Sequence, residues 1–375
     1  MRRLFVLGAG ASAHHSNNAV PVTSGFLSKA FGSGSDASKR LRENPDFALV
    51  ASLVKHLYRF DPTNASESPR LATVNIEELV TLAELESELT GGATQLTALT
   101  SFIRDAVDAF QGEVPSSFKT YATFGRALTN EDSLISFNWD TLLEPCLPGY
   151  RPPELQTPAT LQFAEYLQIC TSELSGTWGN LGSPRPYVSL TSSYEQEIGF
   201  RPTPAFLKMH GSIDAVYCRN PSCGNNQRPF RVKATPRALR CGACFEDLAP
   251  YIVPPVLAKP IRTMPYIRRA WRKARELVLD CEQMIVWGYS LPPTDFWANW
   301  LIRGIAAGRC QSVVIINPEV KFRREDRHNL TFVRRFIPQI LRDAAWFKCY
   351  VCLSYDDYAG GRLQEIPPSD FSVTE

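Results

Sequence analysis

Short apolar runs that end in small or polar residues recur along the chain. Five of them read RLFVLGAG (3–10), SLISFN (133–138), AFLKMHGS (205–212), MIVWGYS (284–290) and SVVIINP (312–318). Continuous apolar runs of this length are typical of parallel strands that are buried on both faces of a sheet. Helical patterns lie between several runs, for example at 268–279 and 296–308. This alternation predicts an α/β fold built on a Rossmann-like, doubly wound parallel sheet.

Between the first two runs the hydrophobic pattern changes to a helical period. Asn75, followed three residues later by Glu78, has the form of a capping box that opens a helix. Stretches rich in Gly, Ser and Pro at 32–38 and 61–69 predict loops at the margins of this region. We therefore expect a helical insertion at 37–130. Its apolar positions at helical spacing include Phe47, Val50, Val54, Leu57, Tyr58, Leu99, Phe102, Ile103, Ala106, Val107 and Phe110.

The charge of the chain is nearly balanced, at 40 basic against 38 acidic residues. This balance gives no general attraction to nucleic acid or membranes, and no apolar run approaches the roughly 20 residues of a membrane span. The N-terminus MRRLFVLGAG is basic and then apolar like a signal peptide, but it is short and runs into glycines that favour a turn. Six of the ten cysteines are scattered, which suits a reducing compartment. We expect a cytoplasmic protein.

The first apolar run ends in a glycine turn, GAGASA at 8–13. Glycines after a strand permit a tight turn and close approach of the backbone to a diphosphate, and the following amides offer an anion site. The dinucleotide fingerprint is incomplete, because Asn17, Asn18 and Pro21 interrupt a long helix and no acidic residue ends a second strand about 20 residues later. The alternative is a tight strand-to-loop turn that holds no ligand.

Polar side chains follow two of the other runs. Asn138 and Asp140 come directly after SLISF, and His210 follows AFLKM. The carboxyl ends of parallel strands meet at one edge of a sheet, where α/β proteins place their ligands. We therefore expect these three side chains to line one cleft. For His210 taken alone, a hydrogen-bonded structural histidine is the competing interpretation.

The remaining four cysteines form two close pairs. Four residues separate Cys218 from Cys223, and after 17 more residues Cys241 and Cys244 follow with two residues between them. Two thiolate pairs on separate turns make a tetrahedral site of soft ligands, which suits Zn²⁺. Four protein ligands leave no open position, so we expect a structural zinc rather than a catalytic one, clamping a small ribbon. Four free cysteines are the alternative.

These patterns divide the chain into a core and its insertions. A helix is expected to begin at Thr141, and another near 161–174. The expected units are a Rossmann-like core at 1–36, 131–216 and 249–347, the helical insertion at 37–130, a zinc ribbon at 217–248, and a C-terminal strand and tail at 348–375.

Taken in order, GAGAS, FNWD, HGS, the paired cysteines, WGYS and IIN resemble the motifs of the sirtuin (silent information regulator) superfamily. The nearest likeness is to the sirtuin-like NAD-hydrolysing proteins of bacterial anti-phage defence. The motifs extend across residues 4–318, and the helical insertion matches only loosely. The resemblance implies a Rossmann-type NAD site and a smaller zinc module inserted in the sheet domain.

The resemblance also implies roles for individual residues. Asn138 and Asp140 match the Asn and Asp of the family's Gln-Asn-Ile-Asp motif, which orients the nicotinamide ribose and its leaving group. His210 matches the catalytic base. The implied NAD-binding positions, the first five on the diphosphate and the last three on the adenosine side, are Gly8, Ala9, Gly10, Ala11, Ser12, Gly288, Ser290 and Asn317.

The part of the family pattern that takes an acyl-lysine is different in this chain. The Gly-Ile-Pro-Asp-Phe-Arg loop is replaced by NNAVPVTSGF, and the Val-Phe-Phe-Gly-Glu segment by APYIVPPVLAKP. Phe137 stands in place of the family's Gln. The resemblance therefore implies an NAD⁺ glycohydrolase (NAD⁺ nucleosidase) that releases nicotinamide and ADP-ribose. A protein deacylase and a non-catalytic module that senses NAD or ADP-ribose are the alternative hypotheses.

The resemblance also implies a biological setting. Defence NADases of this type are commonly homo-oligomers held inactive until a trigger arrives, and short ones pair with a separate ATPase such as a HerA-like translocase. We expect this chain to deplete NAD⁺ on phage infection, with no membrane or direct nucleic-acid partner. The basic run RRAWRKAR is expected to be a solvated helix face, and an assembly surface is the alternative.

Overall fold

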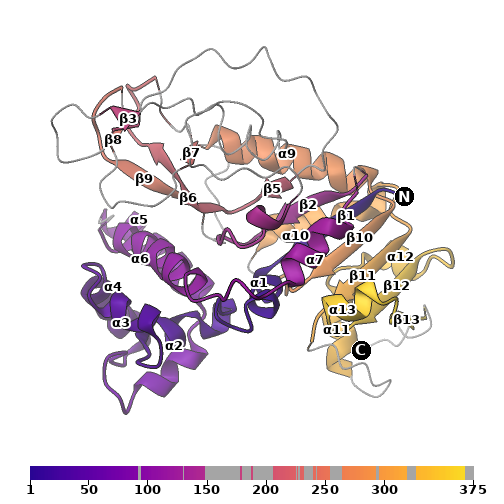
Figure 1. Ribbon diagram of the computed structural model, residues 1–375, viewed down its shortest axis with the longest axis horizontal. Helices are drawn as coiled ribbons and strands as arrows, with labels where there is room; N and C mark the ends of the chain where they lie inside the picture. Colours follow the sequence, from indigo (N-terminus) through magenta and orange to yellow (C-terminus); the bar gives the residue numbers. More distant parts are fainter. Residues whose placement is uncertain are drawn as a thin grey trace.

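A sheet of seven strands forms the centre of the molecule (Figure 1). The computed structural model describes residues 1–91, 94–129, 131–147, 178–179, 187–188, 206–224, 226, 229–231, 240–241, 243–253, 264–292, 295–318 and 327–367. The strands are β1 (Arg3–Leu7), β2 (Ser133–Ser136), β5 (Phe206–Lys208), β10 (Gln283–Trp287), β11 (Ser312–Ile316), β12 (Lys348–Cys352) and β13 (Gln364–Ile366). Their order is β13-β12-β11-β10-β1-β2-β5, and only the β12–β13 pair is antiparallel. All five predicted strands are in this sheet.

Helices cover both faces of the sheet. On β1, Leu4 and Val6 belong to one apolar cluster and Phe5 and Leu7 to another, because successive side chains of a strand point to opposite faces. The first cluster packs against α9 (Pro265–Asp280), α10 (Phe296–Arg303), α11 (Arg327–Arg334) and α12 (Gln339–Arg342). The second packs against α1 (Ala9–His15), α7 (Thr120–Ala127) and α13 (Tyr355–Ala359). The prediction of a doubly wound α/β fold is confirmed.

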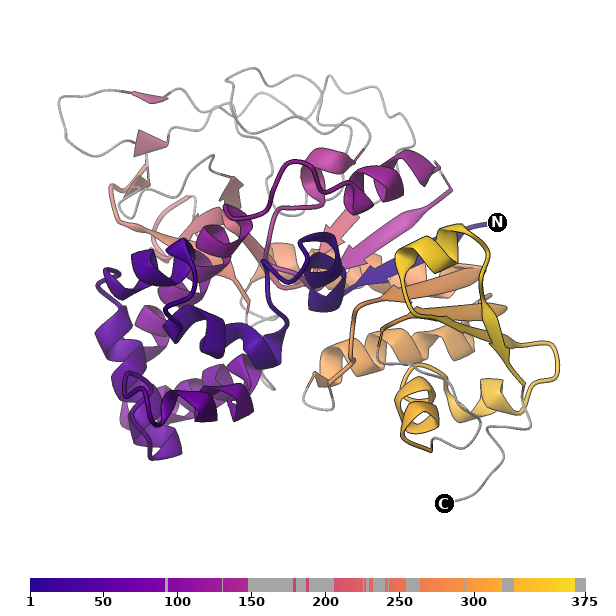
Figure 2. The ribbon, with the colours of Figure 1, turned by 60° about the horizontal axis from the view of Figure 1, so that its bottom comes forward.

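A helical unit with its own apolar core stands beside the sheet (Figure 2). It contains η1 (Thr23–Gly25), α2 (Phe26–Phe31), α3 (Asp36–Arg42), α4 (Phe47–Tyr58), η2 (Ser68–Thr73), α5 (Ile76–Thr90) and α6 (Thr94–Gln111). As predicted, Asn75 caps α5, and its Oδ1 accepts a hydrogen bond from the Glu77 amide at 2.9 Å. Although α7 lies within 37–130, its Tyr121 and Phe124 pack on the sheet.

Short strands form two further sheets, which carry one cysteine of each pair, Cys218 and Cys241. One contains β6 (Gly211–Cys218), β7 (Pro229–Arg231) and β9 (Leu248–Ile252), and the other β3 (Trp178–Gly179), β4 (Tyr187–Val188) and β8 (Arg240–Cys241). Gly211 opens β6 and lets β9 pack against it, because its φ is +73° and a Cβ there would lie 2.0 Å from the carbonyl oxygen of Tyr251 in β9. Ile213 and Ile252 pack into the core of the helical unit, so β6 and β9 join it to the sheet.

Two local predictions have a different outcome. The helix expected to begin at Thr141 is wrong, since that region contains only a 3₁₀ turn, η3 (Glu144–Cys146). An α-helix from Thr141 would place Pro145 where an amide must donate to the first turn, and proline has no amide hydrogen. The helix expected near 161–174 lies outside the described residues. The predicted helix at 296–308 is α10 followed by η4 (Gly304–Ala307). Among the described helices, none is both long and apolar enough to cross a bilayer.

Candidate functional site

A cavity of about 370 Å³ lies at the carboxyl edge of the central sheet. It is at the point where the strand order reverses, because β1 pairs with β2 on one side and with the much later β10 on the other. Ligands of open α/β sheets bind at such switch points, and the volume is within the range of small-molecule sites, about 300–1,000 Å³. The lining residues come from the segments that follow the strands and from the helical unit. They are Ala9, Gly10, Val20, Pro21, Val22, Thr23, Ser24, Phe26, Ile76, Glu77, Val107, Phe137, Asn138, Trp139, Asp140, His210, Gly288, Tyr289, Ser290, Asn317 and Pro318.

The cavity brings together side chains that are far apart in the sequence. Asn138 and Asp140 follow β2, and His210 follows β5, and all three line the cavity and are buried. Of the other predicted positions, five also line the cavity: Ala9, Gly10, Gly288, Ser290 and Asn317. The remaining three, Gly8, Ala11 and Ser12, are not among its lining residues. The chemical roles of all these residues remain predictions.

A hydrogen-bond network fixes Asn138 against the glycine turn. Its Nδ2 donates to the Gly8 carbonyl oxygen and to Ser12 Oγ, each at 2.9 Å. A carbonyl oxygen only accepts, so this contact determines which end of the amide is the nitrogen. Since both amide hydrogens are used in this way, the atom with which Asn138 can contact a ligand is its Oδ1 acceptor.

Ser12 is the centre of this network rather than part of the cavity wall. Its hydroxyl donates to Asp140 Oδ2 at 2.7 Å, and Tyr121 OH lies 2.9 Å from the same Oγ. Ser12 has one hydrogen, which goes to the carboxylate, so Tyr121 must donate to Ser12. Burial raises the pKa of Tyr121 well above its usual value, and the Asp140 charge raises it further, so the phenol stays a neutral donor. Together these contacts join α1, α7 and the end of β2.

A buried ion pair contacts the backbone of the loop that carries Asn138 and Asp140. Lys208 Nζ lies 2.9 Å from Glu144 Oε1, and the two side chains are 1% and 2% exposed. The same ammonium donates to the backbone carbonyl oxygens of Trp139 and Asp140. Buried charges must be paired and hydrogen-bonded to be tolerated, and here their partners connect β5, η3 and the loop.

The glycine turn packs directly on the end of β10. Gly8 N donates to Trp287 O at 3.0 Å, and Gly10 N donates to Gly288 O at 2.8 Å. A Cβ on Gly8 would lie 2.6 Å from the Gly288 oxygen, and a Cβ on Gly288 would lie 2.1 Å from the Ala11 nitrogen. The backbone contact between the two turns is therefore sufficient to require these glycines, whether or not a diphosphate binds beside them.

His210 is held among aromatic and acidic groups. Its Nε2 lies 3.4 Å from Asp295 Oδ2, and Tyr289 OH donates to the same oxygen at 3.2 Å. Phe137 stacks on Tyr289 with ring centroids 4.3 Å apart, and its ring meets the imidazole edge-on at 5.2 Å. Burial raises the pKa of Tyr289 well above its usual value, and the charges of Asp295 and Glu77 add to this, so its hydroxyl remains a donor.

Sequence reasoning missed Asp295, Tyr289 and Glu77. Asp295 precedes the helical run that begins at Phe296, so the start signal of a helix identifies it as a cap but gives no sign of His210. Tyr289 lies inside the WGYS run. Glu77 comes from the first turn of α5 in the helical unit, which brings a second carboxylate to the cavity beside Asp140.

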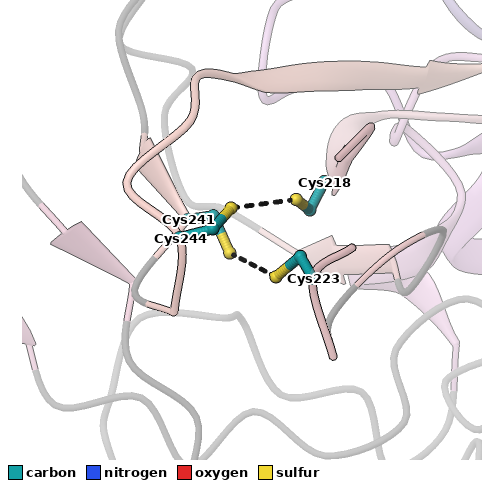
Figure 3. A group of neighbouring side chains, drawn as sticks. All are labelled: Cys218, Cys223, Cys241 and Cys244. Carbon is teal, nitrogen blue, oxygen red and sulfur yellow. Dashed lines mark hydrogen bonds between the residues drawn. The ribbon is translucent and has the colours of Figure 1, made fainter. Parts of the chain in front are cut away.

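The four paired cysteines form a separate cluster (Figure 3). Their sulfurs all lie within 4.8 Å of one another, with 3.5 Å between Cys218 and Cys244 and 3.7 Å between Cys223 and Cys241. These contacts are too long for disulfides of about 2.05 Å. A tetrahedron of sulfurs bound about 2.3 Å from a zinc has edges of about 3.8 Å, which these distances match. The donor set therefore fits a structural Zn²⁺.

The chain matches no family model and no curated protein. It is similar to solved structures of Sir2 homologues. A variant of one, in complex with ADP-ribose, is 15% identical over 89% of this chain and 90% of that chain, with a TM-score of 0.37. A Sir2 homologue in complex with NAD is 17% identical over 84% of this chain and 78% of that chain, with a TM-score of 0.34. At these identities and TM-scores the likeness assigns no activity and no residue role to this chain.

Proposed function

We propose that this protein is an NAD⁺ glycohydrolase that binds NAD⁺ in the cavity at the carboxyl edge of the sheet. The observation that carries the proposal is the convergence of Asn138, Asp140 and His210 from two strand ends on one cavity, whose lining also includes Ala9 and Gly10 of the glycine turn. The motifs that resemble sirtuins supply the substrate class, and the switch-point position of the cavity is where such folds bind dinucleotides.

The proposed reaction breaks the bond between the ribose C1′ and the nicotinamide nitrogen. The electron pair of this bond leaves with nicotinamide, which becomes a neutral pyridine, so no strong general acid is needed. A water oxygen forms the new bond to C1′, and the proton that it loses passes to a base and then to solvent. The site must therefore stabilise an oxocarbenium-like sugar and orient one water, as in other glycoside cleavages.

Each of the three residues has a role that its contacts support. Asn138 would accept a hydrogen bond from a ribose hydroxyl or from the water through Oδ1, because Gly8 and Ser12 hold its other end. Imidazole exchanges protons near neutral pH, so His210 would take the proton. Asp140 would favour the developing positive charge, since Ser12 and the Leu142 amide orient its carboxylate.

The cysteine cluster would hold a zinc ion that supports the fold. Cys218, Cys223, Cys241 and Cys244 provide four ligands, and when bound the ion supplies a tetrahedral cross-link between the turns that carry them. Because it has no open coordination position, it is not expected to take part in cleavage.

The wider setting is a further part of the proposal and rests on the motif resemblance alone. In it, the protein is an intracellular defence effector that depletes NAD⁺ on phage infection, assembled as a homo-oligomer and pairing with a HerA-like ATPase. Size-exclusion chromatography with light scattering, alone and with the candidate ATPase, tests the assembly. A monomeric protein that does not bind the ATPase would refute the proposed assembly, and the proposed enzymatic activity would be unaffected.

The test of the reaction uses purified protein incubated with NAD⁺ and chromatography of the products. The parent and the control His56→Ala, whose side chain is half-exposed on α4, should release nicotinamide and ADP-ribose in equal amounts. His210→Ala should lose about 100-fold or more of the rate, the usual contribution of a positioned base. Asn138→Ala should lose a similar factor, because the sugar and the water are no longer oriented. Zinc content and thermal unfolding show whether the variants are folded. Parental rates in a folded His210→Ala would refute the role of the base, and O-acyl-ADP-ribose formed from an acetyl-lysine peptide would favour a deacylase.

A further inference from the structure

We propose that Asp295 is the positioning residue of His210: its carboxylate sets the tautomer of the imidazole and stabilises the imidazolium. This inference rests on the proposed glycohydrolase function, in which His210 takes the proton. Asp295 is 1% exposed and is absent from the cavity lining, so it acts through His210 rather than on the substrate.

The two oxygens of Asp295 have separate tasks. Oδ1 caps α10 by accepting from the Ala298 amide at 3.0 Å. Oδ2 faces the site, where Tyr289 OH donates to it at 3.2 Å and His210 Nε2 lies at 3.4 Å. Helix α10 thus fixes the carboxylate, and the carboxylate presents one oxygen to the imidazole.

Capping alone does not explain a carboxylate at this position. Three other helices are capped through neutral side chains, those of Ser35, Asn75 and Ser354. Asn and Ser cap helices as well as Asp does, whereas burying a carboxylate costs free energy unless it is paired. Oδ2 of Asp295 contacts both the Tyr289 hydroxyl and the His210 imidazole, and these contacts offset the cost of burying the charge.

The geometry has a chemical consequence for His210. A carboxylate beside Nε2 favours the tautomer with the hydrogen on Nε2, which leaves the lone pair on Nδ1 as the proton acceptor. When Nδ1 takes a proton, the resulting cation lies against the Asp295 charge. Phe137 meets the ring edge-on, the Tyr289 phenol shares Asp295 Oδ2 with it, and two carboxylates, those of Asp140 and Glu77, line the same cavity.

Asp295→Asn is the informative variant, because Asn keeps an oxygen for the Ala298 amide and removes the charge. We expect its thermal unfolding to stay close to that of the parent, and kcat/KM for NAD⁺ to fall about 10- to 100-fold. The acid limb of the pH profile should move about one pH unit lower, because the imidazolium loses its counter-charge. Tyr289→Phe, which keeps the carboxylate, should leave that limb near its parental position.

A measurement on the side chain itself does not depend on turnover. Nitrogen NMR of labelled protein, with the His210 signal identified by its loss in His210→Ala, reports both the tautomer and the titration of this ring. The parent should show the Nε2–H form, and Asp295→Asn should titrate at lower pH. If the parent fails to cleave NAD⁺, the proposed function is wrong but this comparison still tests the pair. Identical titration and tautomer in parent and Asp295→Asn would overturn the inference.

Discussion

The buried pair of Lys208 and Glu144 gives a stability prediction that can be worked out from the structure. In Glu144→Gln the ammonium of Lys208 still donates to the carbonyl oxygens of Trp139 and Asp140, but it no longer has a negative charge beside it. Removing one partner of a buried pair leaves an uncompensated charge, which costs about 3–5 kcal/mol. We expect the free energy of unfolding to fall by this amount, out of a total of about 5–15 kcal/mol.

The double variant Lys208→Met/Glu144→Leu separates charge from packing. Both charges are gone, and of the two carbonyl oxygens that Lys208 contacts the Trp139 oxygen still accepts from the Ile213 amide, whereas the Asp140 oxygen loses the Lys208 donor. One unsatisfied buried carbonyl costs about 1–3 kcal/mol. The double variant should therefore be at least as stable as either single variant, although each single change on its own is costly.

Urea unfolding followed by tryptophan fluorescence and circular dichroism measures these free energies. Lys39→Met is the matched control, because its ion pair with Asp36 is exposed, with side chains 66% and 85% accessible, and its loss should leave the midpoint unchanged. A loss below about 1 kcal/mol in Glu144→Gln, or a double variant whose loss equals the sum of the single losses, would refute the reasoning.

Three further predictions concern other parts of the molecule. A chelator should release one zinc per chain and lower the unfolding midpoint, as measured by metal analysis and calorimetry, and full stability after metal removal would contradict a structural site. Gly288→Ala should destabilise the protein by more than about 1 kcal/mol, because its Cβ would clash with the Ala11 nitrogen. In Gly91→Ala, by contrast, φ is also positive but space is open, so only backbone strain remains. Burial lowers the pKa of His15, whose Nδ1 accepts a hydrogen bond from the Tyr121 amide. As the pH falls below about 6.5, the unfolded chain therefore binds a proton at His15 more readily than the folded chain does. The free energy of unfolding should fall with the pH as a result. His15→Asn should make the free energy of unfolding, measured by urea titration, depend less on pH. An unchanged dependence would show that His15 does not cause it.

Much of the fold follows from patterns between near neighbours in the chain. The five apolar runs became parallel strands, the Asn75 cap begins α5, and the cysteine spacing predicted a cluster that the structure forms. Each of these depends on residues only a few positions apart, or on the rule that parallel strands share an edge. The same rule was enough to place Asn138, Asp140 and His210 at one cavity.

The sequence by itself therefore determined the strands, the helical insertion, the cysteine cluster and the edge of the sheet where polar residues gather. Only the tertiary structure decided which partners fix the polar residues of the site. Asn138 donates a hydrogen bond to Ser12, which is 126 positions away in the chain, and Lys208 forms an ion pair with Glu144, which is 64 positions away. The tertiary structure also showed that Asp295 faces His210 and that a 3₁₀ turn stands where a helix was expected. Local propensity and periodicity describe each segment alone, whereas the partner of a buried polar group depends on which segments pack together, and no short stretch of sequence contains that information.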